Sequence, residues 1–379
     1  MRATIYGGDC RDSMLGLAPS SVDAIVTDPP YGLEFMGRGW DYGVPGRSFF
    51  SAMLEVARPG AHLVAFGGTR LFHRQACAIE EAGWELRDMA MWLYGSGFPK
   101  AADVSKMVDK AAGAEREVVG KKMSGIANAQ ESGRHTVGAS TQVEVDITAA
   151  ATPLALAFDG YKSALKPAWE PIIIAMKPLD GTLAMNAERH GCAGFNVDGC
   201  RIGSEAMKVT QSTGKKVGRS PSMAIPRTDT EVVGEASGRF PANLMLDEEA
   251  GEALDARAGS SVSRYFYSGK ATKRDRTYTD PKTGEECVSD HPTVKPQSLM
   301  RWLTRLVLPP GRDSLPPEHP LHGKPRVVLD PFLGSGSTGV ACVAEGVEHF
   351  IGCERVEHFQ RISEARLKDA GADTKVVPG

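Results

Sequence analysis

The sequence lacks a long apolar run, paired cysteines and an excess of one charge, and each absence excludes a class of protein. No stretch of the 379 residues is apolar over the ~20 positions that a membrane-spanning helix needs. The N-terminal MRATIYGGDC has no signal-peptide pattern. We therefore expect a cytoplasmic protein with no membrane partner.

The seven cysteines are scattered and form no C-x-x-C pair. This distribution indicates reduced thiols and argues against a disulfide framework. The spacing of His190, Cys192 and Cys200 fits no common zinc pattern, so we expect no metal site. Because the net charge is only -3, any surface for nucleic acid must be a local patch.

Both ends of the chain alternate strand-like and helix-like segments. Strands are predicted at 3–6, 24–27, 62–66, 326–330 and 349–354. Amphipathic patterns predict helices over 48–60, 71–83, 296–311 and 337–346, and Gly60 and Gly83 would close the first two. Such alternation predicts a parallel sheet with both faces covered, which the two ends of the chain could share.

The middle of the chain is irregular and carries two basic stretches. A short helix is expected over 102–113 and a strand at 170–175, whereas the rest of 101–160 and all of 203–238 are predicted to be loop-like. Residues 207–227 contain five Lys or Arg and no acid, and RYFYSGKATKRDR (264–276) interleaves aromatic and basic residues. Such stretches suit phosphate neutralisation and base stacking. Most charge runs are solvated, flexible surface loops, so each stretch taken alone favours that interpretation and leaves DNA binding as the alternative.

Asp28 ends the apolar run 24–27 and is followed at once by two prolines and a tyrosine. It is expected at the carboxyl edge of a buried strand. Pro29 and Pro30 cannot continue the strand, because each fixes its φ angle and lacks an N–H group. The stiff turn holds a carboxylate, carbonyl groups and the ring of Tyr31, which is typical either of a solvated strand end or of a catalytic centre.

VVLDPFLGSGSTG (327–339) is a second strand-to-turn motif and contains a literal G-x-G-x-x-G. Glycines let a backbone approach a ligand at a helix N-terminus, and Glu354 at the end of the next strand suits ribose hydroxyls. A nicotinamide-dependent oxidoreductase is disfavoured, because DPFL separates the strand from the glycines and too little chain follows. A P-loop fails because no Lys precedes Ser337 or Thr338. Other adenosine-bearing cofactors remain open.

DPPY (28–31), HPTVKP (291–296) and DPFLGSG (330–336) together resemble the signatures of S-adenosylmethionine-dependent DNA amino-methyltransferases. Their order is similar to that of the circularly permuted beta group, and GSGFPK (95–100) and LKPAWEPIIIAMKP (165–178) look most like phage and prophage members. The resemblance implies an α/β fold, namely a Rossmann-like, doubly wound, mostly parallel seven-stranded methyltransferase sheet with inserted DNA-recognition regions.

The resemblance divides the chain into five segments. Residues 1–100 would be the catalytic half and 286–379 the cofactor-binding half of the methyltransferase domain. Between them, 101–160 would be an insert that contacts DNA, 161–202 would return to the sheet, and 203–285 would be the target-recognition region.

The resemblance also implies roles for individual residues. Asp28, Pro29, Pro30 and Tyr31 would form the catalytic face, with Tyr31 beneath a flipped base. The residues expected to bind S-adenosyl-L-methionine are Asp9, Cys10, Asp28, Thr293, Lys295, Asp330, Pro331, Phe332, Gly334, Ser335, Gly336 and Glu354. Of these, Asp9 would lie near the adenine, Glu354 at the ribose, and Thr293 and Lys295 near the carboxylate of the cofactor. The residues expected on DNA phosphates are Lys215, Lys216, Arg219, Lys273, Arg274 and Arg276.

The chemistry of an exocyclic amine agrees with these roles. Its lone pair is delocalised into the base, so two acceptors on its N–H groups, the Asp28 carboxylate and the Pro29 carbonyl, would favour a pyramidal nucleophile. A flipped base costs roughly a few kcal/mol, which stacking partly offsets. No Pro-Cys pair is present to supply the nucleophile that a C5-cytosine enzyme needs.

We therefore predict a prokaryotic or phage-encoded, site-specific enzyme that methylates the N6 amine of adenine in double-stranded DNA. Cytosine-N4 methylation is the alternative, and a catalytically silent DNA-binding homologue is a more distant one. The sequence leaves open the target site, a homodimer and a partner restriction nuclease.

Overall fold

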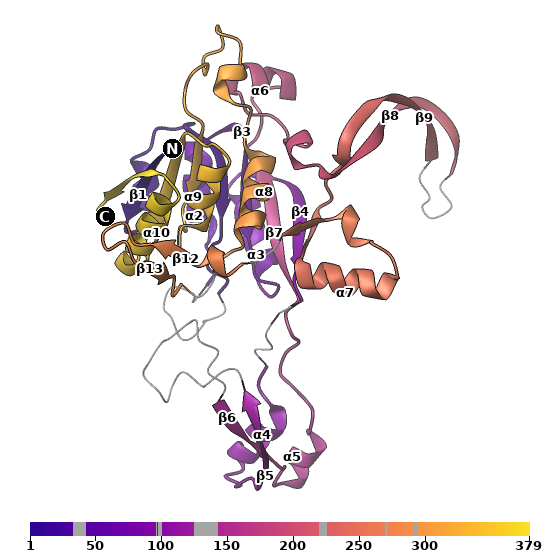
Figure 1. Cartoon of the computed structure of the whole chain (residues 1–379), viewed down its shortest axis with the longest axis vertical. Helices are drawn as coiled ribbons and strands as arrows, with labels where there is room; N and C mark the ends of the chain where they lie inside the picture. The colour runs from indigo at the N-terminus through magenta and orange to yellow at the C-terminus, as the bar shows by residue number, and fades with distance from the viewer. Residues whose placement is uncertain are drawn as a thin grey trace.

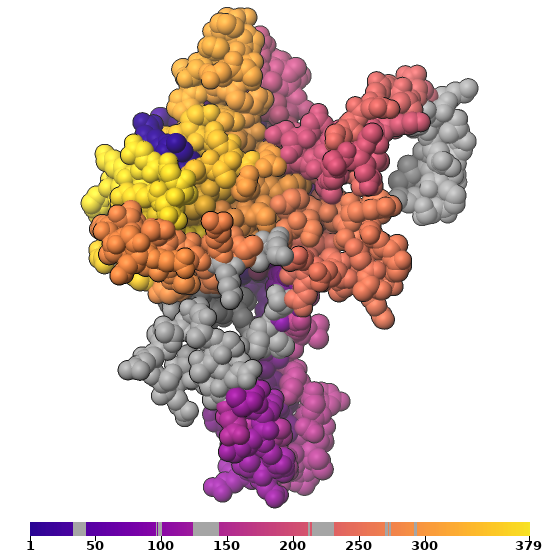
Figure 2. All heavy atoms as spheres, viewed as in Figure 1, coloured from indigo at the N-terminus to yellow at the C-terminus, as the bar shows by residue number. Residues whose placement is uncertain are grey.

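The computed structural model describes residues 1–32, 43–95, 97, 101–124, 143–219, 226–269, 272–291 and 294–379. They form an α/β core from which two parts project: a small lobe of residues 101–124 and 143–165, and a long hairpin of residues 202–239 (Figures 1 and 2). Among the described residues, no helix is long and apolar enough to span a membrane.

The core is a sheet of ten described strands in the order β11-β10-β4-β7-β3-β2-β14-β15-β1-β16. The strands are β1 (Arg2–Gly7), β2 (Val22–Thr27), β3 (Ala57–Phe66), β4 (Glu85–Leu93), β7 (Trp169–Met176), β10 (Leu244–Asp247), β11 (Tyr267–Gly269), β14 (Val327–Asp330), β15 (His349–Glu354) and β16 (Asp373–Val377). Within this sheet only β7 runs antiparallel to its neighbours, β3 and β4. The expected mostly parallel α/β sheet is confirmed, but it is wider than seven strands because β16 extends one edge and β10 and β11 the other.

The two ends of the chain build this sheet together, as the sequence predicts. β2 pairs in parallel with β14, where Ala24 lies opposite Val328, and β1 pairs with β15. Every residue of β2 is buried. A central strand covered on both faces favours apolar residues, and the buried Asp23 within β2 pairs with Arg58, whose Nε lies 2.9 Å from Oδ1, and with Arg312.

Helices cover both faces of the sheet (Figure 1). One face carries α1 (Cys10–Leu15), α2 (Arg47–Val56) and α3 (Phe72–Glu81), and the other carries α8 (Gln297–Val307), α9 (Ser337–Ala344) and α10 (Glu357–Asp369). The first group packs around Phe50 and Ile79, and the second around Leu303 and Phe350. Complete burial of one such side chain stabilises the fold by roughly 1.5–3 kcal/mol.

Gly60 does not close a helix, contrary to the expectation from the sequence. Helix α2 ends at Val56, and β3 begins at Ala57, so Gly60 lies within β3 with a φ of 76°. Pro59 explains the early end, because a proline and the residue before it disfavour helical geometry. Gly83 does follow α3 as expected, and its N–H donates to Glu80 O at 2.9 Å.

Much of the middle of the chain is regular where loops were expected. The long hairpin consists of β8 (Ile202–Arg219) and β9 (Pro226–Arg239), and the small lobe contains α4 (Val104–Ala111), β5 (Val118–Ser124), β6 (Val143–Thr148) and α5 (Pro153–Ala157). Further elements are α6 (Leu183–His190), α7 (Glu248–Ala258), β12 (Thr277–Thr279) and β13 (Glu286–Val288). Among the described apolar side chains of the long hairpin, Ile202 is the one that is buried, so the described part lacks the alternation of a half-buried strand, and the sequence analysis did not predict the hairpin. Residues 203–285 also supply β10 and β11, so this stretch is partly built into the sheet.

The small lobe is organised around a buried carboxylate. The Asp109 side chain accepts hydrogen bonds from Arg116 Nη1 at 2.5 Å, from the Thr152 hydroxyl at 2.8 Å, and from the N–H groups of Ala151 and Thr152 at 3.0 Å. These donors come from the segment after α4 and from the segment before α5, and the hydrogen bonds fix both segments to α4. The lobe thereby holds its shape with few buried apolar side chains.

Candidate active site

A cleft of about 1390 Å³ opens at the edge of the sheet where β2, β14 and β15 end. Asp28 follows β2 directly, Asp330 is the last residue of β14, and Glu354 is the last residue of β15. All three line the cleft. Open α/β sheets bind their ligands outside the carboxyl ends of the strands, so the cleft lies at the expected place.

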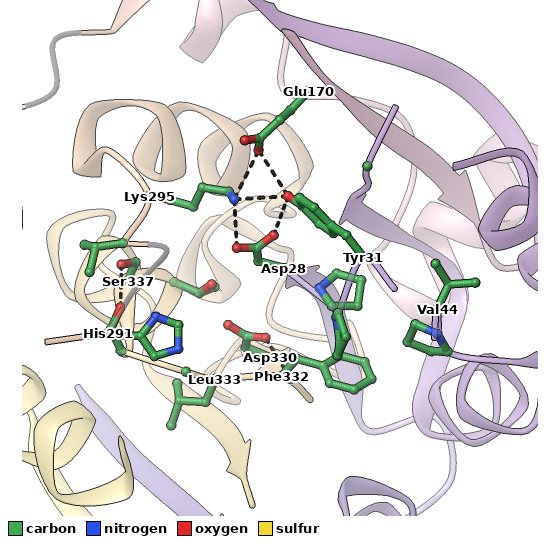
Figure 3. Close-up of a pocket in the computed structure, with 18 of the residues that line it drawn as sticks. Asp28, Tyr31, Val44, Glu170, His291, Lys295, Asp330, Phe332, Leu333 and Ser337 are labelled. Carbon is green, nitrogen blue, oxygen red and sulfur yellow. Dashed lines mark hydrogen bonds and ion pairs between the residues drawn. The ribbon is translucent and has the colours of Figure 1, made fainter. Parts of the chain in front are cut away.

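Four polar side chains form a closed cluster in this cleft, which we call the Asp28 cluster: Asp28, Tyr31, Glu170 and Lys295 (Figure 3). The Tyr31 hydroxyl donates to Asp28 Oδ1 at 2.7 Å and lies 3.1 Å from Glu170 Oε2. Lys295 Nζ lies 2.8 Å from Asp28 Oδ2, and 3.1 Å from both Glu170 Oε2 and the Tyr31 hydroxyl. Both carboxylate oxygens of Asp28 therefore have a donor from this chain.

Glu170 reaches the cluster because β7 runs against its neighbours. The first residues of β7 lie at the same edge of the sheet as the last residues of β3, where Gly67 N donates to Pro171 O at 2.9 Å. The sequence analysis placed Glu170 in the strand and gave it no role in the site. An acid directly before the apolar run PIIIA was the available signal, but the direction of the strand was not.

The Asp28 cluster carries a net negative charge. The Lys295 side chain is only 7% exposed. Its burial alone would lower its pKa, but the carboxylates of Asp28 and Glu170 outweigh burial and raise the pKa of Lys295 above its usual value. Burial and the same carboxylates raise the pKa of Tyr31 well above that of a free phenol, so Tyr31 is a neutral donor. Two carboxylates and one ammonium leave one negative charge in the cluster.

The Tyr31 ring lies between Lys295 and Gly68. Lys295 Nζ is 5.3 Å from the ring centroid, and a Cβ at Gly68 would come within 3.1 Å of Tyr31 Cβ. Gly68 thus allows the ring to approach the backbone. The hydroxyl fixes the orientation of Tyr31 through Asp28, and its role as a platform for a base stays a prediction.

The glycine loop between β14 and α9 is held by Glu354. Gly334 N donates to Glu354 Oε2 at 2.8 Å, and Val356 N donates to Oε1 at 2.7 Å. Burial raises the pKa of Glu354 to about 7. Gly334 has a φ of 51°, and a Cβ there would lie 2.9 Å from His291 Nε2, so the position requires glycine on both grounds.

Asp330 fastens the base of this loop. Its Oδ1 accepts from the Thr27 hydroxyl at 2.7 Å and from Phe332 N at 3.1 Å. Burial raises the pKa of Asp330 to about 6. The bond to Thr27 joins the end of β14 to the end of β2, so the glycine loop and the DPPY turn are held in a fixed relation.

The cleft continues past the end of β1 to Asp9 and Cys10. Asp9 caps α1 by accepting from Arg11 N at 2.9 Å. Its carboxylate also pairs with the Arg11 guanidinium at 2.7 Å, and the hydrogen bond from Arg11 lowers the pKa of Asp9. The ends of β1, β2, β14 and β15 and the start of α1 thus surround one continuous cleft.

The comparison with protein families shows to which family the chain belongs. The family model for DNA methylases matches residues 22–365, which include all three signatures. The chain belongs to the DNA methylase family. The family resemblance that the sequence implies is therefore confirmed.

Individual relatives of this DNA methylase match over shorter lengths. The Type II methyltransferase M2.LlaDCHI of Lactococcus lactis subsp. cremoris is 30% identical over 123 residues, which are 30% of this chain and 40% of the relative. The Type II methyltransferase M.HinfI of Haemophilus influenzae is 33% identical over 93 residues, 23% of this chain and 22% of the relative. These matches thus span less than half the length of either relative.

Solved structures resemble the DNA methylase over nearly its whole length. The M1.HpyAVI-SAM complex has a TM-score of 0.40 and 16% identity, and covers 97% of this chain and 100% of its own. PvuII DNA methyltransferase, which is cytosine-N4-specific, has a TM-score of 0.44 and 13% identity, and covers 99% and 95%.

The methyl donor of this family is S-adenosyl-L-methionine, and the cleft of the DNA methylase fits it. Gly334 has no side chain, and a Cβ there would collide with His291, so only backbone lines the cleft at this point of the loop. The Phe332 and Phe49 rings, with centroids 5.8 Å apart, offer an apolar wall. Each oxygen of Glu354 keeps a lone pair for ribose hydroxyls.

Most of the residues expected to bind the cofactor lie together in the cleft. They are Asp9, Cys10, Asp28, Lys295, Asp330, Pro331, Phe332, Gly334, Ser335 and Glu354. Gly336 is the N-cap of α9, behind the lining, and Thr293 lies outside the described residues. The ammonium of Lys295 contacts Asp28 and Glu170, and its place near the cofactor carboxylate stays a prediction.

The residues expected on DNA lie in two separate elements. Lys215, Lys216 and Arg219 belong to β8 in the long hairpin, and Lys273 and Arg274 belong to the 3-10 turn Lys273–Asp275. The side chains of Lys215, Lys216, Arg219 and Lys273 lie outside the described part. Arg276 lines the cleft, where its Nη1 donates to His291 O at 2.9 Å.

The three residues considered for a metal have different surroundings. His190 Nε2 lies 2.9 Å from Asp180 Oδ2, the Cys192 thiol faces Asp23, and the Cys200 thiol faces Trp302 O. In the described part of the chain, no group of three or more His, Cys, Asp or Glu is arranged to hold a metal ion.

Arg366 on α10 ties the glycine loop to the second basic stretch. Its Nη1 donates to Ser335 O at 2.5 Å, and its Nη2 donates to Asp275 O at 2.6 Å. Arg366 is only 4% exposed. The guanidinium thus fixes two backbone segments that lie far apart in the sequence.

Proposed function

We propose that this protein transfers a methyl group from S-adenosyl-L-methionine to the exocyclic N6 amine of adenine in DNA. The observation that carries the proposal is the placement of the DPPY turn and the glycine loop on one cleft, fastened by the hydrogen bond from Thr27 to Asp330. DPPY is more frequent in adenine enzymes than in cytosine-N4 enzymes, which favours adenine. Cytosine N4 remains the other amine that this chemistry would serve.

The catalytic work falls to Asp28 and the carbonyl of Pro29. Both follow the buried strand β2 and are held by two prolines, so they need little rearrangement when a substrate arrives. As acceptors on the two N–H groups, they would localise the lone pair of the amine. The bound cofactor supplies an electrophilic methyl group. As the amine nitrogen gains positive charge, the adjacent Asp28 carboxylate stabilises it and can accept the proton that leaves.

Base flipping and DNA binding are proposed for the parts around the cleft. Tyr31 offers its ring to the flipped base. We assign the phosphate contacts to Lys215, Lys216, Arg219, Lys273, Arg274 and Arg276. The small lobe is proposed to contact DNA as well, because residues 163–168, which connect it to β7, line the cleft. Double-stranded DNA bound between core and lobe would lie over the entrance.

Nucleoside mass spectrometry of DNA after incubation with protein and S-adenosyl-L-methionine tests the proposal. N6-methyladenine is the expected product. N4-methylcytosine would replace the adenine assignment with the cytosine alternative. Absence of both products, with cofactor binding intact, would indicate a catalytically silent DNA-binding protein.

A further inference from the structure

Glu170 has no part in the chemistry described so far, although it completes the Asp28 cluster. Its Oε2 lies 3.1 Å from both Lys295 Nζ and the Tyr31 hydroxyl, and its side chain is 20% exposed. These two partners are the same groups that occupy the oxygens of Asp28. The two carboxylates therefore compete for one hydroxyl proton and share one ammonium.

This sharing bears on how Asp28 becomes available to an amine. A carboxylate oxygen that accepts a short hydrogen bond from Tyr31 is less able to accept one from a substrate. The Tyr31 hydroxyl has a second acceptor within reach, however, because Glu170 Oε2 lies at 3.1 Å. Rotation of the hydroxyl hydrogen about the Cζ–Oη bond of Tyr31 lets the hydroxyl donate to Glu170 instead of Asp28. Asp28 Oδ1 is then free to accept a hydrogen bond from the substrate.

Charge gives Glu170 a second effect on Asp28. If Glu170 were neutral, the ammonium of Lys295 at 2.8 Å would cancel the charge of Asp28, and the cluster would be neutral. An amine that gains positive charge in the transition state would then face no net negative charge. With Glu170 ionised, the cluster stays negative while Lys295 still holds Asp28 in place.

We propose that Glu170 is a positioning residue for methyl transfer: it withdraws the Tyr31 hydroxyl from Asp28 and offsets Lys295, so that Asp28 meets the amine as a free, charged acceptor. This inference rests on the proposed function. Glu170 acts through Asp28 and needs no contact with the base. Its effect is therefore expected in the rate of the chemical step and not in cofactor binding.

A double-mutant cycle tests this assignment with the full-length protein. Glu170→Gln leaves the cluster neutral, and we expect the single-turnover rate to fall by about 30-fold or more, with the Kd for S-adenosyl-L-methionine changed by less than about 3-fold. Lys295→Met leaves Asp28 and Glu170 without the cation that lies between them, so the two carboxylates would share a proton, and this variant is also expected to be slow. The double variant Glu170→Gln/Lys295→Met restores one net negative charge, so it should react faster than either single variant.

Several outcomes would overturn the assignment. Glu170→Gln at the wild-type rate would remove Glu170 from the chemistry. A double variant slower than both single variants would show that the residues only support the fold, and thermal melting of each variant measures such a loss. Glu81→Gln, an exposed acid on α3, is the matched control and should behave as wild type. If wild-type protein makes neither methylated base, the proposed function fails; if it is active and the cycle shows no rescue, only the role of Glu170 fails.

Discussion

Replacement of Asp28 by asparagine isolates the charge of the proposed acceptor. The side chain keeps its shape, and Lys295 keeps Glu170 as a partner at 3.1 Å, so the fold should be retained. The amine loses a negative charge at about 4 Å, which is worth about 4 kcal/mol at an effective dielectric constant of about 20. Since each 1.36 kcal/mol is about a tenfold change in rate, the chemical step should slow by about 10³-fold.

Single-turnover methylation of a DNA substrate, followed by mass spectrometry of the nucleosides, measures this change directly. Calorimetric titration with S-adenosyl-L-methionine should show a change in Kd far smaller than the change in rate, because the glycine loop and Glu354, which are expected to hold the adenosine part of the cofactor, are untouched. Asp12→Asn, an exposed residue on α1, is the control. A rate for Asp28→Asn within about tenfold of wild type would refute the proposed role of Asp28.

Four further predictions concern cofactor binding, stability and DNA binding. Gly334→Ala should weaken cofactor binding by about tenfold or more, as measured by calorimetry. The reason is that a left-handed φ costs an L-residue roughly 1–2 kcal/mol and that the new methyl group meets His291. Unchanged affinity would show that the cofactor does not approach this loop. The pKa of Glu354 is raised to about 7, so the folded state holds a proton that the unfolded state releases, and the contribution of Glu354 to stability should fall as pH rises from about 5 to 8. Urea unfolding over this range should therefore show that stability falls less, or rises more, with pH in Glu354→Gln than in wild type. Cofactor affinity should rise as pH rises from about 5 to 8, because Glu354 becomes a charged acceptor for ribose hydroxyls. Equal affinity at the two ends of this pH range would exclude that role. Arg274→Glu should weaken DNA binding and reduce its salt dependence without changing the Kd for the cofactor. A fluorescence anisotropy titration at several salt concentrations measures this effect. An unchanged dependence of DNA affinity on salt would remove Arg274 from the phosphate contacts.

The sequence predicted the parts of the cleft that depend on short stretches of chain. Asp28 and Asp330 each end an apolar run, and prolines or glycines follow them, so their places at strand ends could be inferred without knowledge of the rest of the fold. Parallel strands present their carboxyl ends at one edge, so two such residues of one sheet can meet there. The hydrogen bond from Thr27 to Asp330 shows that the two strand ends are adjacent.

Features that depend on distant pairing could not be predicted in this way. Glu170 belongs to the Asp28 cluster only because β7 is antiparallel to β3, and no local pattern gives the direction of a strand. Lys295 contacts Asp28 because α8 and the segment before it pack over the cleft, which its motif alone does not state. The error at Gly60 has a local cause, since Pro59 was a stop signal that the amphipathic pattern outweighed.

The position of Arg366 has a consequence for the order and strength of ligand binding. Its guanidinium joins the backbone at Ser335, on the side of the cofactor, to the backbone at Asp275, beside the basic stretch. A displacement of either segment therefore strains the other. If DNA shifts the basic stretch and so changes affinity for the cofactor by some factor, the cofactor must change affinity for DNA by the same factor. One buried side chain would thus make the two binding events thermodynamically interdependent.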